Sequence, residues 1–401
     1  MEELLKAREE RSTHIHYLMS KNEYKTIVIM KANVPGIEKN LEKMRFICNF
    51  YHKLIHDSFG EKIVDSERME SLDGNYIYYV IDEVGTVVKE KTIIIEDDNA
   101  LGRLIDIDVY DQKSISREDV ACEMRRCLVC NNYAHICSRS KAHDESEIFD
   151  KIDGIISDFL TNFLLMKTIE SIYAELDMYP KFGLVSRVDS GCHNDMDYET
   201  FVQSTLSIKP HLREYIQYGL RKEHNPKMLQ EIGKRAEAAM FETTGNVNTQ
   251  KGLIFALGLF LPVITKAIID NKTKDDVISE IKILAQEIIG TYFDSINEDT
   301  AKTYGDNIYL KYGYKGIRGE ALNGFEKVFK NNRYYEDEND RFVQYLIGLM
   351  SELKDTTILH RKDITTLEKV NNEMKSIIKN GGYLNNKELV HSLSNEYKEL
   401  G

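Results

Sequence analysis

The spacing of apolar residues changes character along the chain. Strand-like runs, with two-residue alternation or β-rich composition, occur only in the first 110 residues, where they are interspersed with helical spacing. The expected helices there are residues 1–20 and 38–59, and the expected strands are 24–32, 76–80, 92–95 and 103–110. This mixed order predicts an α+β N-terminal domain.

Beyond residue 147 the apolar spacing is helical almost throughout. It predicts an all-α C-terminal domain with helices at 199–220, 226–243, 252–270, 275–294, 338–354 and 363–378. A chain of 401 residues exceeds what one hydrophobic core usually organises, so two domains are expected. No linker rich in Pro, Gly or Ser separates them. We place the boundary inside the long helical stretch, giving domains 1–156 and 157–401.

The strand expected at 103–110 carries a pair of carboxylates. Its apolar residues share one face, and Asp106 and Asp108 share the other. Same-face neighbours on a strand lie about 6.5–7 Å apart, so both side chains can hold one Mg2+, which completes its shell with water and phosphate oxygens. The alternative is a half-buried strand with two solvated aspartates, and the pair alone leaves both open.

A cluster of potential metal ligands follows, with the spacing C-x2-C-x6-C-x5-H: Cys127, Cys130, Cys137 and His143. Structural zinc sites often begin with C-x2-C, because one turn brings both thiolates to the same ion. The alternative is a set of half-buried thiols beside a basic loop. Arg125 and Arg126 belong to that loop, and arginine suits bidentate contact with phosphate.

Four polar loops lie at or beside expected helix starts, at 183–197, 244–252, 316–321 and 355–361, and the first three contain glycine. Backbone N–H groups at a helix start bind phosphate, although each loop can equally be an ordinary cap. Asp195 and Asp197 are candidates for a metal site. Lys251, Arg318 and Arg361 are candidates for contact with a triphosphate.

Charge and composition narrow the classes of function. With 53 basic and 66 acidic residues the formal net charge is −13, which argues against a general nucleic-acid or membrane-surface binder. The N-terminus lacks the pattern of a signal peptide, and the six cysteines then favour a reducing cytoplasm. The longest apolar run, Leu253–Thr265, is expected to be a buried helix because it is too short to span a bilayer.

The first domain resembles the transferases that attach phosphoribosyl-dephospho-CoA to citrate lyase. The matching pieces are Arg8 with Arg11, Pro35-Gly36, Gly102-Arg103-Leu104 with Asp106-Ile107-Asp108, and Arg125-Arg126-Cys127-Leu128 with Cys130, Cys137 and His143. The resemblance implies that a serine of the lyase acyl carrier protein attacks a phosphate and releases pyrophosphate. It further implies that Asp106 and Asp108 hold Mg2+, while Arg103, Arg125 and Arg126 grip phosphates. His143 is a candidate base if it binds no metal.

The second domain resembles the triphosphoribosyl-dephospho-CoA synthases. The matching pieces are Gly183-Leu184-Val185 with Arg187, His193-Asn194-Asp195-Met196, Val247-Asn248-Thr249 with Lys251-Gly252, Arg318-Gly319-Glu320-Ala321, and Leu359-His360-Arg361. The resemblance implies that 3′-dephospho-CoA attacks the ribose of ATP and expels adenine. Stabilisation of the sugar cation would fall to Asp195, Asp197 or Glu320, binding of the triphosphate to Lys251, Arg318 and Arg361, and a further substrate contact to Arg187.

The second domain departs from the synthase pattern at several positions. Phe182 and Ser186 stand where the pattern has Pro and Asp, Gln250 stands where it has His, and Lys354 and Thr357 interrupt a late motif. The glycine-rich segment that closes the pattern is not found before Gly401. These departures leave activity of the first domain alone as an alternative. A malonate decarboxylase carrier is an alternative acceptor because that system uses the same prosthetic group, although the first-domain motifs favour citrate lyase. An alternative of another class is a non-catalytic, metal-stabilised scaffold that binds dephospho-CoA or a lyase subunit.

Overall fold

The computed structural model describes residues 2–330 and 337–400, and the chain divides into two compact units. Unit 1 comprises Met1–Leu160 with Ile268–Asn271, and unit 2 comprises Thr161–Ala267 with Lys272–Gly401. Each unit encloses its own hydrophobic clusters.

Unit 1 is built on one antiparallel sheet with the strand order β2-β3-β1-β4-β5. Its strands are β1 (Thr26–Ala32), β2 (Ile63–Met69), β3 (Tyr76–Ile81), β4 (Ile105–Tyr110) and β5 (Ser114–Ile115). Its helices are α1 (Glu2–Lys21), α2 (Glu42–Phe59), α3 (Gly85–Asp97) and α4 (Ala134–Ser140), with short 3-10 turns at Gly60–Lys62, Ala100–Leu104 and Glu118–Val120. Helix α5 (Glu145–Asp177) begins in unit 1 and ends in unit 2.

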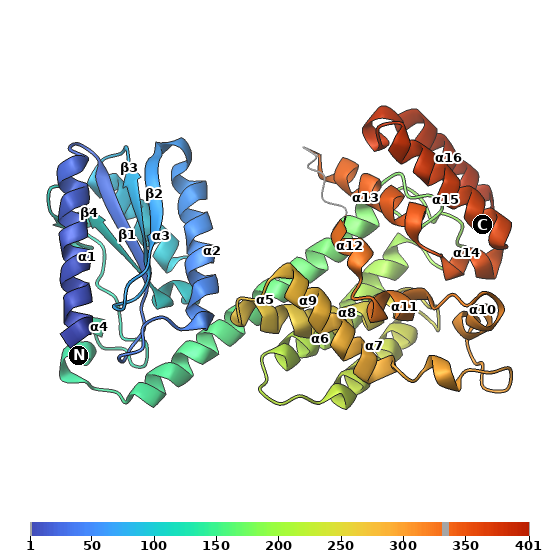
Figure 1. Cartoon of the computed structure of the whole chain (residues 1–401), viewed down its shortest axis with the longest axis horizontal. Coiled ribbons are helices and arrows are strands. Elements are labelled where there is room, and N and C mark those ends of the chain that lie inside the picture. Colours follow the sequence, from blue (N-terminus) through green and yellow to red (C-terminus); the bar gives the residue numbers. More distant parts are fainter. Residues whose placement is uncertain (1, 331–336, 401) are drawn as a thin grey trace. The chain divides into compact units, whose positions relative to one another are not determined.

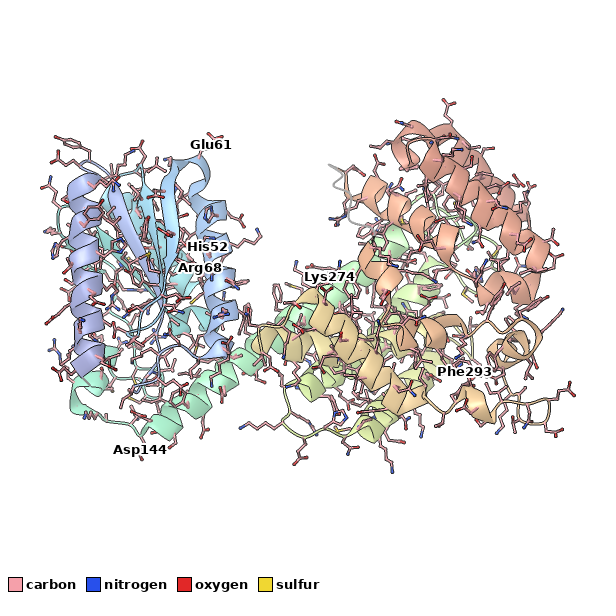
Figure 2. The ribbon with its side chains drawn as sticks, in the orientation of Figure 1. His52, Glu61, Arg68, Asp144, Lys274 and Phe293 are labelled. Carbon is pink, nitrogen blue, oxygen red and sulfur yellow. The ribbon has the colours of Figure 1, made fainter. Side chains whose placement is uncertain are left out.

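Helices cover both faces of this sheet (Figure 1). Helix α1 packs on one face, where Ile15 and Leu18 meet Ile27 and Ile29 of β1. Helices α2 and α3 pack on the other face. On the α2 side, Arg68 of β2 donates to Asn49, and Figure 2 shows its side chain near His52. The central strand β1 is therefore buried from both sides, which fits its β-branched sequence.

Unit 2 is helical. Its helices are α6 (Tyr198–Gly219), α7 (Pro226–Thr243), α8 (Lys251–Ile269), α9 (Lys274–Ile289), α10 (Tyr304–Tyr312), α11 (Gly316–Leu322), α12 (Glu326–Lys330), α13 (Glu338–Glu352), α14 (Thr356–Arg361), α15 (Ile364–Lys379) and α16 (Lys387–Leu400). Residues of α6, α7, α8 and α9 form one cluster, and residues of α13, α15 and α16 form another. The six helices expected from the spacing match α6, α7, α8, α9, α13 and α15 to within a few residues.

Among the described residues, α8 is long and apolar enough to cross a membrane by length and composition. Core helices of soluble proteins pass the same test, and α8 contributes Ile254, Leu259 and Leu261 to the cluster with α6, α7 and α9. The apolar run noted in the sequence is thus part of a longer, 19-residue helix, of which one side is buried.

The structure corrects the fold class expected from the sequence. Within residues 2–330 and 337–400, helices dominate and the five strands all lie between residues 26 and 115. Residues 92–95, expected as a strand, lie within α3. The isoleucine-rich run has β propensity, but the helix buries Val88, Thr92 and Ile95 at helical spacing against the sheet, and packing overrides propensity. Strand β4 begins at Ile105 because the preceding residues form a 3-10 turn.

Candidate functional site

The two carboxylates of β4 lie on the sheet face that α1 covers. The side chains of Asp106 and Asp108 alternate with buried apolar ones, as the strand period requires. In the register of β1 with β4, Lys31 lies opposite Asp106 and Ile29 lies opposite Asp108. A lysine therefore stands beside the aspartate pair on the same face of the sheet.

The pKa of the Asp108 carboxyl group is strongly raised. Burial and the neighbouring charge of Asp106 raise its pKa to about 6, although Lys89 and Lys31 oppose the shift. Burial and the charge of Arg11 lower the pKa of Lys31. Two carboxylates that disfavour each other's charge form a donor set that a divalent cation stabilises, and hard oxygen ligands suit Mg2+.

A buried glutamate fixes the strand and its arginines. The carboxylate of Glu96 on α3 accepts a 2.9 Å hydrogen bond from the Ile107 N–H, and it pairs with Arg117 at 2.8 Å and Arg125 at 2.6 Å. Arg125 also donates to the Ile105 carbonyl at 2.9 Å and lies 3.7 Å from Asp106. Glu96 thus holds Arg125 beside the aspartate pair.

The turn before β4 requires a glycine. A Cβ on Gly102 would lie 1.9 Å from the Glu96 carbonyl oxygen, so no larger residue fits there. The turn places Arg103, whose guanidinium donates to the Arg126 carbonyl and whose pKa is lowered by burial and by Arg125. Arg126 stacks on Tyr133 with its guanidinium carbon 4.4 Å from the ring centre.

A second charged group occurs at the loop between β2 and β3. The Asp73 side chain is only 2% exposed and accepts from Arg8 at 2.7 Å and from Arg11, while Lys31 lies 3.9 Å away. Burial raises its pKa, but the hydrogen bond from Arg8 and the charges of Arg11 and Lys31 outweigh burial, so the pKa is lowered. The Arg-x-x-Arg pair of α1 is thereby tied to the sheet near Lys31.

The structure brings the four predicted ligands of the C-x2-C-x6-C-x5-H motif together. The ligand atoms of Cys127, Cys130, Cys137 and His143 all lie within 4.8 Å of one another. The three cysteines are free thiols.

In unit 2, the loop 183–197 meets helix α14. The guanidinium of Arg361 donates to Cys192 at 2.8 Å and lies 3.4 Å from His193 Nδ1, and this nitrogen is 3.6 Å from Asp195. Burial and the charge of Arg361 lower the pKa of His193. Two of the sequence candidates, Asp195 and Arg361, therefore flank one histidine.

Other candidates of this loop have structural partners. Asp197 is the N-cap of α6 and accepts from the N–H and hydroxyl of Thr200, and these bonds lower its pKa. Arg187 pairs with Asp177 at 3.1 Å and donates to the Tyr198 hydroxyl. Asp197 therefore acts as a helix cap, which is the alternative that the sequence left open for these loops.

The remaining unit 2 candidates lie on other helices. Lys251 at the start of α8 pairs with Glu237 at 2.9 Å, and Glu320 of α11 accepts from Lys327 at 2.6 Å. Arg318 of α11 lies over the Tyr292 ring at 4.3 Å. In the described part of the chain, no hydrogen bond or ion pair links these three candidates to the group around His193.

Both units match known families. Residues 1–159 match the CitX model, apo-citrate lyase phosphoribosyl-dephospho-CoA transferase, and residues 167–401 match the CitG model, ATP:dephospho-CoA triphosphoribosyl transferase. Protein CitXG of Haemophilus influenzae is 30% identical over 394 residues, covering 92% of this chain and 84% of the relative. The chain belongs to the CitXG family. It is therefore a transferase that joins the two enzymes of citrate lyase prosthetic-group synthesis in one polypeptide.

Further relatives match nearly the whole chain or about half of it. Protein CitXG of Leuconostoc mesenteroides is 27% identical over 399 residues, covering 92% of this chain and 85% of the relative. A probable 2-(5''-triphosphoribosyl)-3'-dephosphocoenzyme-A synthase of Streptococcus mutans is 32% identical over 235 residues, which are 52% of this chain and 79% of that protein.

At one departure from the synthase pattern, Gln250, both polar atoms of the side chain are hydrogen-bonded. Buried Gln250 accepts from the Ser204 hydroxyl at 2.7 Å and donates to Thr205 at 3.0 Å. These hydrogen bonds connect the start of α8 to α6. Gln250 thus helps to position the helix that begins at Lys251.

Sequence reasoning missed several charged residues around β4. Glu96 directly follows residues 92–95, which were expected as a strand, whereas Arg117 and Asp73 lay in segments with no expected element. Lys31 could have been found, because a lysine within an otherwise apolar run marks a polar position on a buried strand. Asp73 gave no signal of its own, since its partners are 42 or more residues away in the sequence.

Proposed function

We propose that unit 2 makes the prosthetic group of citrate lyase and that unit 1 attaches it to the acyl carrier protein of that enzyme. The observation that carries the proposal is the group of charges around Asp106 in a chain matched by both families in order. Two carboxylates with adjacent cations suit a polyphosphate substrate bound with Mg2+.

In unit 1, a serine hydroxyl of the carrier attacks the α-phosphorus of the triphosphoribosyl precursor. The new P–O bond forms as the α,β-phosphoanhydride bond breaks, pyrophosphate leaves, and the serine proton passes to a base. Asp106 and Asp108 would hold Mg2+, which neutralises charge on the pyrophosphate. Arg125 and Lys31 stand where they can orient the phosphates, and Arg103 and Arg126 supply further cations.

In unit 2, the 2′-hydroxyl of 3′-dephospho-CoA attacks the anomeric carbon of ATP. A C–O bond forms as the C–N bond to adenine breaks, the hydroxyl proton passes to the departing adenine, and the triphosphate stays on the ribose. Positive charge develops on the sugar, so carboxylates such as Asp195 and Glu320 would stabilise it. Arg361, Lys251, Arg318 and Arg187 are the proposed contacts to phosphates or substrate, and binding requires them to exchange their present partners.

The experiment supplies the whole chain with ATP, 3′-dephospho-CoA and Mg2+ and measures adenine by chromatography. Apo-carrier is then added, and pyrophosphate and the carrier mass are measured. We expect adenine release first, and pyrophosphate with a mass increase only after carrier addition. Formation of neither product would overturn the proposal.

Two further arms separate the alternatives. Labelling of the carrier from a preformed precursor without any adenine release would restrict activity to unit 1. Labelling of a malonate decarboxylase carrier in preference to the citrate lyase carrier would replace the proposed acceptor.

A further inference from the structure

The segment between β5 and α5 folds without an apolar core of its own. Every residue from 116 to 151 is described, and Cys137 is the only apolar residue among them that is buried. The segment nevertheless has a defined path, with a bridge between Arg126 and Tyr133 and the short helix α4. Small segments that cannot bury enough apolar surface usually need a disulfide or a metal for stability.

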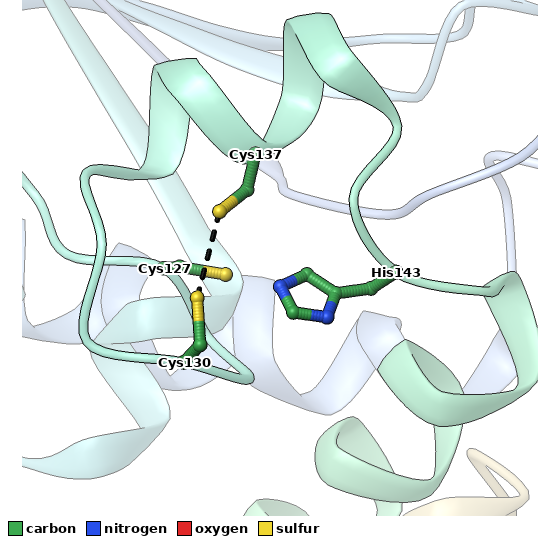
Figure 3. Close-up of side chains that lie close together, drawn as sticks. All are labelled: Cys127, Cys130, Cys137 and His143. Atoms are coloured by element: carbon green, nitrogen blue, oxygen red, sulfur yellow. Dashed lines mark hydrogen bonds between the residues drawn. The ribbon is translucent and has the colours of Figure 1, made fainter.

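The side chains at the centre of this segment supply a ligand set. Figure 3 shows the sulfurs of Cys127, Cys130 and Cys137 converging, with the His143 ring facing them. The Cys130 and Cys137 sulfurs are 3.5 Å apart, far beyond the bond length of a disulfide. A tetrahedral Zn2+ with bonds of about 2.3 Å to sulfur requires sulfur separations of about 3.8 Å, so a small adjustment fits the ion.

The histidine has an unused nitrogen. Its Nε2 is buried with no hydrogen-bond partner among the described residues, whereas its Nδ1 lies 3.3 Å from Glu147 Oε2. A carboxylate on one ring nitrogen orients the other toward a metal and is the usual outer partner of a histidine ligand. The unpartnered Nε2 is therefore a second, independent sign of a bound ion.

The backbone also has the form of a metal-binding turn. The Val129 N–H donates to Cys127 Sγ at 3.4 Å, and the Cys127 N–H donates to the Asn132 carbonyl at 2.6 Å. After α4 ends, Lys141 adopts a left-handed conformation, and the Ala142 N–H returns to the Cys137 carbonyl at 3.0 Å. These turns aim ligands from both sides of α4 at one point.

We propose that Cys127, Cys130, Cys137 and His143 bind one structural Zn2+. Three thiolates and one imidazole favour zinc over Mg2+ or Ca2+, which prefer oxygen, and four protein ligands leave no open position for catalysis. The site would stabilise the segment that follows Arg125 and Arg126, and Arg125 itself contacts Ile105 and Asp106 of β4. The proposal that these residues bind zinc does not depend on the proposed function. Any effect of the metal on carrier modification does, because it requires that unit 1 modifies the carrier.

The test measures zinc in the whole chain, purified under reducing conditions from zinc-supplemented medium, by inductively coupled plasma mass spectrometry. We expect about one Zn2+ per chain, falling at least tenfold in Cys130→Ser. The matched control is Cys122→Ser, a free cysteine five residues before the cluster, which should keep the metal. Less than about 0.1 Zn2+ in the wild-type chain, or equal zinc in the two variants, would overturn the proposal.

A spectroscopic arm tests the ligand set without any assay of activity. The Co2+-substituted chain should show thiolate-to-metal charge transfer in the near ultraviolet and the visible bands of tetrahedral cobalt, and Cys130→Ser should lose them. Glu147→Gln should weaken metal affinity about 10- to 100-fold while keeping the spectrum. Octahedral cobalt bands without charge transfer would contradict thiolate ligation, whether or not adenine release and carrier labelling occur.

Discussion

The two units hold their candidate residues in different ways. In unit 1 the charges pair through buried carboxylates, since the Asp73 and Glu96 side chains are 2% and 3% exposed. In unit 2 they lie on loops and helix ends, and the Asp195 side chain is 62% exposed. Unit 1 therefore presents a rigid arrangement before substrate arrives, whereas unit 2 leaves its groups paired with partners that substrate must displace.

The largest effect should follow from removing a buried carboxylate. Glu96→Gln removes the buried carboxylate that pairs with Arg117 and Arg125 and leaves them only the more exposed Asp97 and Asp106. Removing one partner of a buried ion pair costs about 3–5 kcal/mol. Denaturant unfolding by circular dichroism, with hydrogen exchange at β4, measures the loss. The control is Glu320→Gln, whose pair with Lys327 is more exposed and is worth about 1 kcal/mol or less. Equal losses would remove the contrast between the units.

A change in unit 2 should affect catalysis more than stability. Arg361→Ala removes the cation beside His193. Because hydrogen bonds to a charged group are lost, we expect kcat/KM for adenine release to fall about 10- to 100-fold. Carrier labelling from preformed precursor should not change. Arg341→Ala, which removes an exposed pair with Glu338 on α13, serves as the control. Unaltered adenine release in Arg361→Ala would exclude Arg361 from the site.

The raised pKa of Asp108 predicts a stability cost that depends on pH. Because its folded pKa of about 6 exceeds the ordinary 3.8, folding favours the protonated form, and stability falls as pH rises from about 4 to about 6. Without added divalent cation, Asp108→Asn should be more stable than wild type by about 1–3 kcal/mol at pH 7.5 and about equal at pH 4. Thermal unfolding at both pH values checks this, and a difference independent of pH would contradict it.

The smallest effect concerns a helix cap. Asp197→Ala should cost about 1 kcal/mol of unit 2 stability, because the α6 cap is lost, while adenine release well below the unfolding temperature stays within about twofold. Thr273→Ala removes the equivalent capping box of α9 and is the matched control. A drop of tenfold or more in Asp197→Ala alone would show that Asp197 acts in the chemistry.

The strand period explains what could be predicted from the sequence. Alternation alone placed Asp106 and Asp108 on one face, and the C-x2-C spacing placed two thiols in one turn. The helix α3 was missed because its isoleucines have β propensity and only the packed sheet selects the helical form. Pairs such as Arg361 with Cys192 join residues 169 positions apart, so no local pattern contains them.

The same limit applies to the buried charges. Asp73 and Glu96 each look like ordinary surface acids in sequence, and their role depends on arginines brought from other elements. Periodicity reports which face a residue occupies, but the partner across that face comes from tertiary structure.

The central claim is that each unit carries one step, and Asp106→Asn tests it most directly. The whole chain is given ATP, 3′-dephospho-CoA, Mg2+ and apo-carrier, and adenine and carrier mass are followed together. We predict wild-type adenine release, accumulation of the triphosphoribosyl precursor, and carrier labelling about 10²- to 10³-fold slower. Parallel loss of adenine release, or labelling at the wild-type rate, would contradict the account.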